Sequence, residues 1–413
     1  LSAAAGFNGF DTTPFDSYIY QPGQPGFRPA YADIMDPDFE LPKDMKMSIG
    51  MDWELGDGWY FSADYLKTET DKDLHFKQLR LGNPAFAGSV NCPEIGNSIS
   101  NMPIGTAVDG RQIYADYSYC GKAMEKFYDG RGYDMLLTNT DKGHSDLVSL
   151  SMAKTWDSWD IYASYTWQDV QSVGNLSSSR NISNFKYTTK YADFNEDVLH
   201  RSIYSREHTF NFVANYTKYF FDNHPTIFTF VGAAISGEPF SYTFGNYKDG
   251  ALWGLDKEST RDATAAFYVP NGDVVVPSYF QSDLDSYIAA AGLSGYAGGF
   301  APINGFETDW NYRLDFKLTQ EFPGLGLTDK DKFVLTLDVE NLLNLIDSEY
   351  GRQTKASASD RSIAEAVPVS LGDGNFTYEY KPAYKMSLAK IHNESTNYYR
   401  SLYRIQLGFK YMF

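Results

Sequence analysis

The last eleven residues of the chain alternate between large apolar side chains and mostly polar or small ones. The odd positions are Tyr403, Ile405, Leu407, Phe409, Tyr411 and Phe413, and the even ones are Arg404, Gln406, Gly408, Lys410 and Met412. A β-strand projects successive side chains to opposite faces, so this segment predicts a strand with one apolar and one polar face. The ends of soluble domains are usually polar and frayed. We therefore interpret the terminal strand as one that faces lipid.

The same alternation predicts eight further strands. With the terminal one they are 45–53, 59–65, 145–156, 159–169, 207–219, 226–236, 310–319, 333–339 and 403–413. Short turns such as Gly56-Asp57-Gly58 and Asp157-Ser158 alternate with long irregular connections. Transmembrane β-barrels have short periplasmic turns and long extracellular loops. We therefore expect the short turns and Phe413 on the periplasmic side.

Nine strands are an odd number, and the first one runs inward from the outside. Single-chain bacterial barrels have an even number of strands. Open sheet edges are not stable in hydrocarbon, because unpaired backbone groups there are costly. We therefore expect an all-β fold in which residues 44–413 are the C-terminal strands of a larger antiparallel transmembrane β-barrel. Residues 1–43 are then the tail of an extracellular loop.

The composition of the chain limits the class of protein to which it can belong. The net charge of −18 argues against a nucleic-acid partner, because phosphate binding needs clustered Lys and Arg. No run of 18 apolar residues exists, which excludes a transmembrane helix. The 32 Tyr and 29 Phe are typical of a barrel with aromatic girdles. They are equally compatible with a secreted carbohydrate-binding β-sandwich, which stays open as an alternative.

Several late segments resemble the C-terminal barrel of TonB-dependent outer-membrane receptors. They are Arg313-Leu314-Asp315-Phe316-Lys317-Leu318, the Asp338-Val339-Glu340-Asn341-Leu342-Leu343-Asn344 element and the strand that ends in Phe413. Ser236-Gly237-Glu238-Pro239-Phe240-Ser241, after the strand pair 207–236, resembles the Oar-like branch of that family. The resemblance covers most of residues 44–413, although the long loops match nothing in it.

The resemblance implies a barrel of about 22 strands in the bacterial outer membrane, with a plug domain at the N-terminal side. It implies uptake of a large solute, energised through TonB. Neither the plug nor a TonB-contact segment is visible in this sequence, so this activity is expected of the parent protein. The implied partners are outer-membrane lipid, the TonB complex, the plug, the barrel-assembly machinery and an unidentified solute or protein ligand. Tyr411 and Phe413 would form the barrel-insertion signal. A structural or adhesive surface protein that displays its long loops is the alternative function.

The connection 237–308 is the best candidate for ligand contact. It holds nine Asp or Glu, three Lys or Arg, and thirteen aromatic residues. Aromatic rings stack on apolar and sugar-like surfaces, and binding residues concentrate in loops on rigid scaffolds. The alternative is that the connection folds over the barrel mouth as a lid. The candidate ligand-contact residues are Tyr242, Tyr247, Trp253, Tyr268 and Tyr287.

Other chemistry is sparse. Cys92 and Cys120 are separated by 28 positions, which predicts a loop disulfide worth roughly 3–4 kcal/mol, with two free thiols as the alternative. The sequence holds no catalytic motif and no close histidine pair, so we expect no enzyme activity, no cofactor and no metal centre. Calcium binding by the acidic loop residues stays open, since no EF-hand-like spacing supports it.

Two further sets of residues, charged side chains on the polar face and tryptophans beside short turns, carry predictions about the barrel wall. The inward-facing charges are Arg313, Asp315, Lys317, Asp338, Glu340, Arg404 and Lys410. They could line a solute path, but a solvated wall whose charges pair with one another and with the plug is the favoured interpretation. Trp53, Trp59, Trp156 and Trp159 flank short turns, where we expect the periplasmic aromatic girdle.

Overall fold

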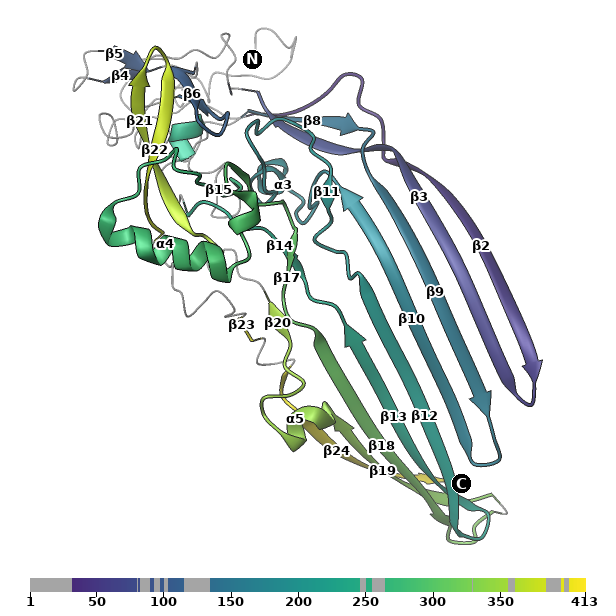
Figure 1. The fold of residues 1–413 in the computed structure, drawn as a ribbon. Helices are drawn as coiled ribbons and strands as arrows, with labels where there is room; N and C mark the ends of the chain where they lie inside the picture. Colours follow the sequence, from purple (N-terminus) through teal and green to yellow (C-terminus); the bar gives the residue numbers. More distant parts are fainter. Residues whose placement is uncertain are drawn as a thin grey trace, which may run out of the picture.

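The structure is a computed structural model. It describes residues 32–79, 81, 90–92, 97–99, 103–114, 134–245, 250–254, 264–328, 330–355, 361–383, 395–396 and 401–413. Nine long strands form one antiparallel sheet in chain order (Figure 1). They are β2 (Lys43–Gly56), β3 (Trp59–Gln78), β9 (His144–Thr155), β10 (Trp159–Ser172), β12 (His208–Phe221), β13 (His224–Ile235), β18 (Asn311–Pro323), β19 (Lys332–Glu340) and β24 (Arg404–Met412). All nine predicted strands are therefore present, in the predicted order.

The connections alternate in length as predicted. The turns β2–β3, β9–β10, β12–β13 and β18–β19 lie at one end of the sheet together with the C-terminus, and the long connections lie at the other end (Figure 1). Asp57 and Asn223 adopt left-handed backbone angles, with φ of 49° and 59°. Asp and Asn tolerate this conformation in tight turns. The two ends of the sheet are here called the turn end and the loop end.

The second strand is longer than the sequence indicated. Residues from 70 onward were expected to be irregular, yet β3 continues to Gln78. Beyond Glu69, which still pairs with β9, the strand pairs with β8 (Asp134–Thr140). The other side of β8 pairs with β1 (Ala32–Met35). This polar extension satisfies its backbone hydrogen bonds outside the apolar part of the sheet, so hydrophobic alternation could not reveal it.

Cross-strand register aligns the apolar positions of all nine strands. Directly opposed residues of an antiparallel pair share a face. Phe316 opposes Phe230 on one side and Val339 on the other, and Val339 opposes Ile405. This apolar face carries Met45, Met47, Ile49, Met51, Trp53, Trp59, Phe61, Ala63, Tyr65, Val148, Leu150, Met152, Trp159, Ile161, Ala163, Tyr165, Trp167, Phe210, Phe212, Ala214, Tyr216, Phe228, Phe230, Gly232, Ala234, Tyr312, Leu314, Phe316, Leu318, Phe333, Leu335, Leu337, Val339, Ile405, Leu407, Phe409 and Tyr411.

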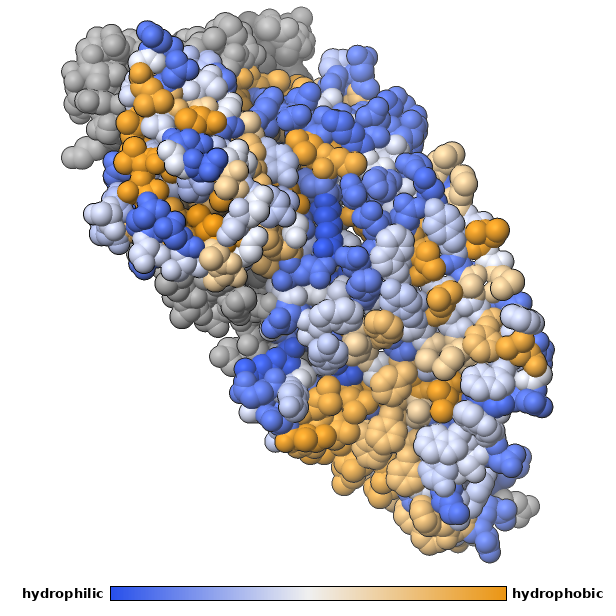
Figure 2. All heavy atoms as spheres, in the orientation of Figure 1, coloured by the Kyte–Doolittle hydropathy of each residue, from blue (hydrophilic) through white to orange (hydrophobic). Residues whose placement is uncertain are grey.

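The apolar face is a surface, not an interior. Phe409 is 70% exposed and Ile405 is 56% exposed, while Phe316 and Leu318 are half-buried on the same face. Figure 2 shows apolar side chains gathered over β12, β13 and β18 toward the turn end. The nine strands are therefore not wrapped around a globular core. Among the described residues the pairing order runs from β2 to β24, with each of these two strands at an edge of the nine.

The long connections fold together at the loop end into a second body, here called the cap. It comprises the described residues of 81–114, 173–206, 236–308 and 361–383, and it lies at the upper left of Figure 1. Its strands are β4 (Val90–Cys92), β5 (Asn97–Ile99), β6 (Gly105–Ala107), β7 (Gln112–Ile113), β11 (His200–Arg201), β14 (Pro239–Phe240), β15 (Tyr268–Val269), β16 (Gly299–Phe300), β17 (Phe306–Glu307), β21 (Ala364–Gly372) and β22 (Asn375–Pro382). Its helical segments are α3 (Asn181–Lys186), η2 (Gly250–Trp253), α4 (Ser278–Ala290) and η3 (Ser294–Tyr296).

The last long connection holds the remaining short elements, namely α5 (Leu342–Ile346), β20 (Thr354–Lys355) and β23 (Ser395–Thr396). In the same connection β21 and β22 pair with each other as an antiparallel hairpin. No helix in the part of the chain that the structure describes is long and apolar enough to cross a membrane.

Candidate functional site

Aromatic side chains concentrate at the turn end of the apolar face. The rings of Trp59 and Trp156 lie 6.2 Å apart, and those of Trp159 and Tyr216 lie 4.7 Å apart. The Lys154 ammonium lies 5.0 Å from the Trp59 ring centroid and donates a hydrogen bond to the carbonyl of Asp57 in the turn. A lysine that leaves an apolar face for the polar edge behaves as lysines do at a membrane interface.

A second aromatic group lies toward the loop end of the same face. Tyr165 and His208 are joined by a 2.9 Å hydrogen bond between the hydroxyl and Nδ1. The His208 ring stacks on Trp310 at 6.0 Å, and Trp310 stacks on Tyr312 at 6.3 Å. Together with Trp167 and Tyr65, these rings form a second belt across the strands.

The spacing of the two belts is close to the height of the apolar band of outer-membrane barrels. Trp159 and Trp167 both lie on the apolar face of β10, eight residues apart. At about 3.4 Å per residue this separation is roughly 27 Å along the strand, which is about 19–22 Å along the membrane normal for a strand tilted by about 35–45°. Outer-membrane barrels carry an apolar band about 25 Å tall between their aromatic girdles.

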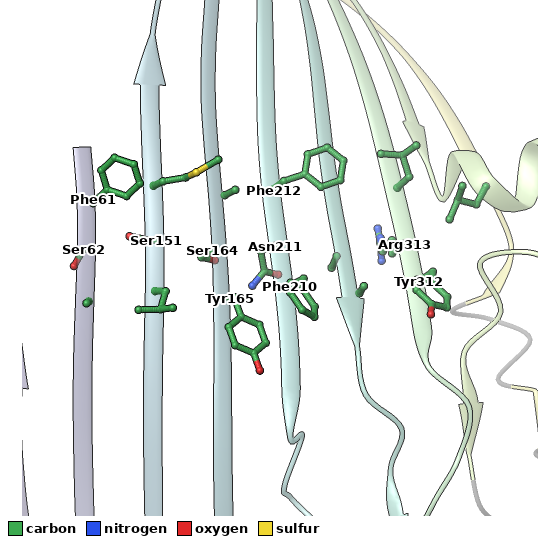
Figure 3. A pocket seen from close by; sticks show the side chains of 18 of the residues that line it. Phe61, Ser62, Ser151, Ser164, Tyr165, Phe210, Asn211, Phe212, Tyr312 and Arg313 are labelled. Carbon is green, nitrogen blue, oxygen red and sulfur yellow. The ribbon is translucent and has the colours of Figure 1, made fainter. Parts of the chain in front are cut away.

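At the second belt, and from there toward the first, the apolar face is hollowed by a shallow groove of about 790 Å³. Figure 3 shows two of its rows, one with Phe61 and Phe212 and one with Tyr165, Phe210 and Tyr312. Ser62, Ser151, Ser164, Asn211 and Arg313 occupy the row between them, at polar-face positions of the strands. The groove is therefore lined mainly by the apolar face itself and offers few polar groups to a ligand.

The opposite, polar face carries ion pairs across β18, β19 and β24. Lys317 Nζ lies 2.9 Å from Asp338, and Arg313 Nε lies 2.9 Å from Asp315. Glu340 lies 3.9 Å from Arg313 and 3.8 Å from Arg404. Six of the seven predicted inward charges thus pair with one another, as in the favoured interpretation of a solvated wall.

The aromatic residues proposed for ligand contact lie in the cap core. Tyr242, Trp253, Tyr268 and Tyr287 are each at most 4% exposed. Tyr242 meets the Tyr287 ring edge-on at 6.1 Å, and Trp253 lies 5.6 Å from Phe244. These rings face one another because the connection folds on itself and on the other loops. This placement agrees with the lid alternative, and ligand contact by these residues stays a prediction.

Three buried basic groups lie at the base of the cap. Burial lowers the pKa of His75 to about 4 and that of Lys190 to about 8. Burial also lowers the pKa of His200, whose ring nitrogens lie 3.1 Å from the Val173 carbonyl and 2.9 Å from the Arg201 carbonyl. Sequence reasoning missed this cluster, because its members are far apart in the chain and follow no spacing.

The Asn-Leu-Leu-Asn element turns the chain sharply after β19. Asn341 adopts a left-handed conformation with φ of 54°, and its Nδ2 donates to the carbonyls of Gly351 and Ser401. Asn344 Nδ2 donates to the carbonyls of Ser348 and Tyr350. The two amides therefore have a structural role, holding α5 and the following loop beside the start of β24.

Of the remaining predicted site residues, the structure describes some and not others. Tyr411 donates a 2.8 Å hydrogen bond to Asp331 in the β18–β19 turn, and Phe413 is 86% exposed and stacks on Tyr411 at 5.9 Å. Their role as an insertion signal stays a prediction. Tyr247, Cys120 and the side chain of Cys92 fall outside the described residues. Within the described residues no group of three or more His, Cys, Asp or Glu could hold a metal ion.

No protein-family model and no curated protein matches the chain. Among solved structures, it is similar to the outer membrane transporter YddB from Escherichia coli. The identity is 9%, the match covers 86% of this chain and 33% of that one, and the TM-score is 0.37. The chain thus spans about one third of the length of that transporter.

Proposed function

We propose that this chain forms part of the wall and the extracellular cap of an outer-membrane transporter. The observation that carries this proposal is the apolar face, which is continuous over nine strands and bracketed by two aromatic belts. Soluble monomers rarely expose a continuous apolar surface of this size, and such surfaces mark contact with a membrane or another protein. In a bilayer it would contact acyl chains, while the polar face would line the interior.

The sidedness supports the same assignment. The short turns and the C-terminus share one end, as on the periplasmic side of outer-membrane barrels, and the cap occupies the other. Among the described residues β2 and β24 each lie at an edge. We infer that strands from elsewhere in the parent protein complete the wall, since an unpaired edge is costly in hydrocarbon.

We further propose that the parent protein is a TonB-dependent receptor of the Oar-like branch that takes up a large solute. The segments 313–318, 338–344 and 236–241 support this part through their resemblance to that family. A receptor of that branch would also require a plug domain and a TonB-contact segment.

The membrane assignment is tested by single tryptophans in lipid that carries brominated acyl chains. In a background without native tryptophan, Leu407→Trp on the apolar face should be quenched, and Gln406→Trp on the polar face should not. Equal quenching at both positions would refute the membrane face. A separate growth assay on a solute that the parent protein takes up should show dependence on TonB. Growth without TonB would favour the adhesive or structural alternative.

A further inference from the structure

The cap contains a fully buried arginine. Arg111 follows the β6–β7 turn, and its side chain and that of Asp109 are both 0% exposed. A guanidinium removed from water needs a counter-charge and hydrogen-bond acceptors, because its desolvation is otherwise strongly unfavourable. Asp109 supplies the charge: Arg111 Nη1 donates to its Oδ2 at 2.6 Å.

The other donors of Arg111 reach two different long connections. Its Nε donates to the carbonyl of Tyr191 at 3.1 Å, in the connection between β10 and β12. Its Nη2 donates to the carbonyl of Ala266 at 2.7 Å, in the connection between β13 and β18. One planar guanidinium therefore holds two backbone segments that are far apart in sequence.

Asp109 extends the contact to the last long connection. Tyr378 of β22 donates its hydroxyl to Asp109 Oδ1 at 2.9 Å, and Trp253 Nε1 donates to the Tyr378 oxygen at 3.2 Å. Burial raises the pKa of Tyr378 well above its ordinary value, so the hydroxyl stays a donor at physiological pH. The Asp109–Arg111 pair thus bonds to members of all three other connections.

Aromatic rings enclose the guanidinium. Its central carbon lies 4.8 Å from the Phe300 ring centroid, 5.1 Å from Trp253, 5.4 Å from Phe244 and 6.0 Å from Phe194. Cations are attracted to such ring faces, most strongly where water is excluded. These rings come from the same two connections whose carbonyls Arg111 binds. Arg111 therefore contacts each of these connections through both a hydrogen bond and an aromatic ring.

We propose that Arg111 couples the four long connections into one lid, which opens or stays shut as a unit. None of the other three connections can leave the cap without breaking a hydrogen bond to the buried Asp109–Arg111 pair, and the two that carry the enclosing rings would also expose the guanidinium to water. Removing the guanidinium should therefore loosen all four connections together, not just its own segment 103–114. This inference rests on the contacts of the cap and holds whether or not the parent protein depends on TonB.

Hydrogen–deuterium exchange on the full-length parent protein in lipid vesicles tests the proposal. Arg111→Ala should accelerate amide exchange roughly 100-fold or more in 103–114, 188–195, 264–268 and 375–382, while β9, β10, β12 and β13 keep their protection. Arg201→Ala is the matched control. Arg201 pairs with Glu207 and Glu307 but is partly exposed, so its loss should affect only the segments near these residues.

Two further measurements exclude general unfolding as the cause. Heat-modifiable gel mobility should show an intact sheet in the Arg111→Ala protein. Methylguanidinium should restore slow exchange, whereas methylammonium should not, because only the planar fork reproduces the lost hydrogen bonds.

Acceleration confined to 103–114, or equal rescue by both cations, would overturn the proposal. If Arg111→Ala gives no folded protein, the same exchange measurement is made on Arg111→Lys, which retains the positive charge but lacks the planar guanidinium. Failure of both variants to form a folded sheet would also contradict a lid that is separable from the wall.

Discussion

The sheet and the cap place the same types of residue in opposite ways. In the sheet, large apolar side chains such as Phe409 point outward and are 70% exposed, and charges pair on the other face. In the cap, side chains such as Phe267 point inward and are 0% exposed, and the buried charges of Asp109 and Arg111 are enclosed. Burial of apolar surface is favourable only relative to water. The contrast supports the proposal that the two regions face two solvents, hydrocarbon around the sheet and water around the cap.

The largest expected effect comes from truncating one phenylalanine in each region. Phe267 lies 5.2 Å from Phe244 and 5.7 Å from Tyr380 in the cap core. Phe267→Ala should lower the free energy of cap opening by about 3–5 kcal/mol, because it leaves a cavity among buried rings. Hydrogen exchange of β15, β16 and β22 measures this change. Phe409→Ala should leave cap exchange unaltered; a similar loss from both variants would mean that the two regions do not fold separately.

A charge placed on either face of one strand sharpens the comparison further. Phe316→Arg puts a guanidinium on the apolar face of β18. It should lower the free energy of unfolding in lipid by about 2–4 kcal/mol. Thr319→Arg puts the same group on the polar face of that strand and should cost far less. Urea titration in lipid vesicles measures both variants. Equal costs would show that the apolar face does not contact the bilayer.

The wall could be predicted from sequence because its pattern is local. A strand shows its two faces with a period of two, so the nine strands, their order and the side of each turn followed from positions such as Trp310 to Leu318. The polar extension of β3 was missed, and so were β8 and β1, which pair beyond it, since this pairing leaves no apolar alternation.

The cap could not be predicted in the same way, because its contacts join residues that are distant in sequence. Asp109 and Tyr378 are 269 positions apart, and no periodicity connects them. The aromatic content of 237–308 was a visible signal, but it fits ligand contact and a folded core equally well. Burial of Tyr242, Trp253, Tyr268 and Tyr287 shows that these rings form the core.

Acidification should weaken the cap and spare the wall. His75 Nε2 lies 2.9 Å from the Asn195 carbonyl oxygen, and the charged groups near the ring are Lys190, Asp197 and Lys77. The pKa of His75 is lowered from 6.5 to about 4, chiefly by burial, so the open state binds a proton before the closed state does. Stability is therefore complete above pH 6.5 and falls as the pH approaches 4, by roughly 2 kcal/mol at pH 5.

Hydrogen exchange of 188–200 between pH 7 and 5, corrected for the intrinsic rate, measures this loss. His75→Gln keeps a side chain that can hydrogen-bond the Asn195 carbonyl but does not titrate, so the pH dependence of that segment should become shallower. An unchanged profile in this variant would assign the effect to other groups.

The smallest expected effect is on the polar face of the sheet. Lys317 and Asp338 form an ion pair of 2.9 Å, with side chains 47% and 32% exposed. Water and salt screen such pairs, so Lys317→Ala should change the folding free energy by less than about 1 kcal/mol, and the change should shrink at high salt. A double-mutant cycle with Asp338→Ala, measured by urea titration in vesicles at low and high salt, isolates the pair. A coupling of several kcal/mol would mean that this face is shielded from water. The polar face of the sheet would then not differ from the cap interior, where the Asp109–Arg111 pair is buried.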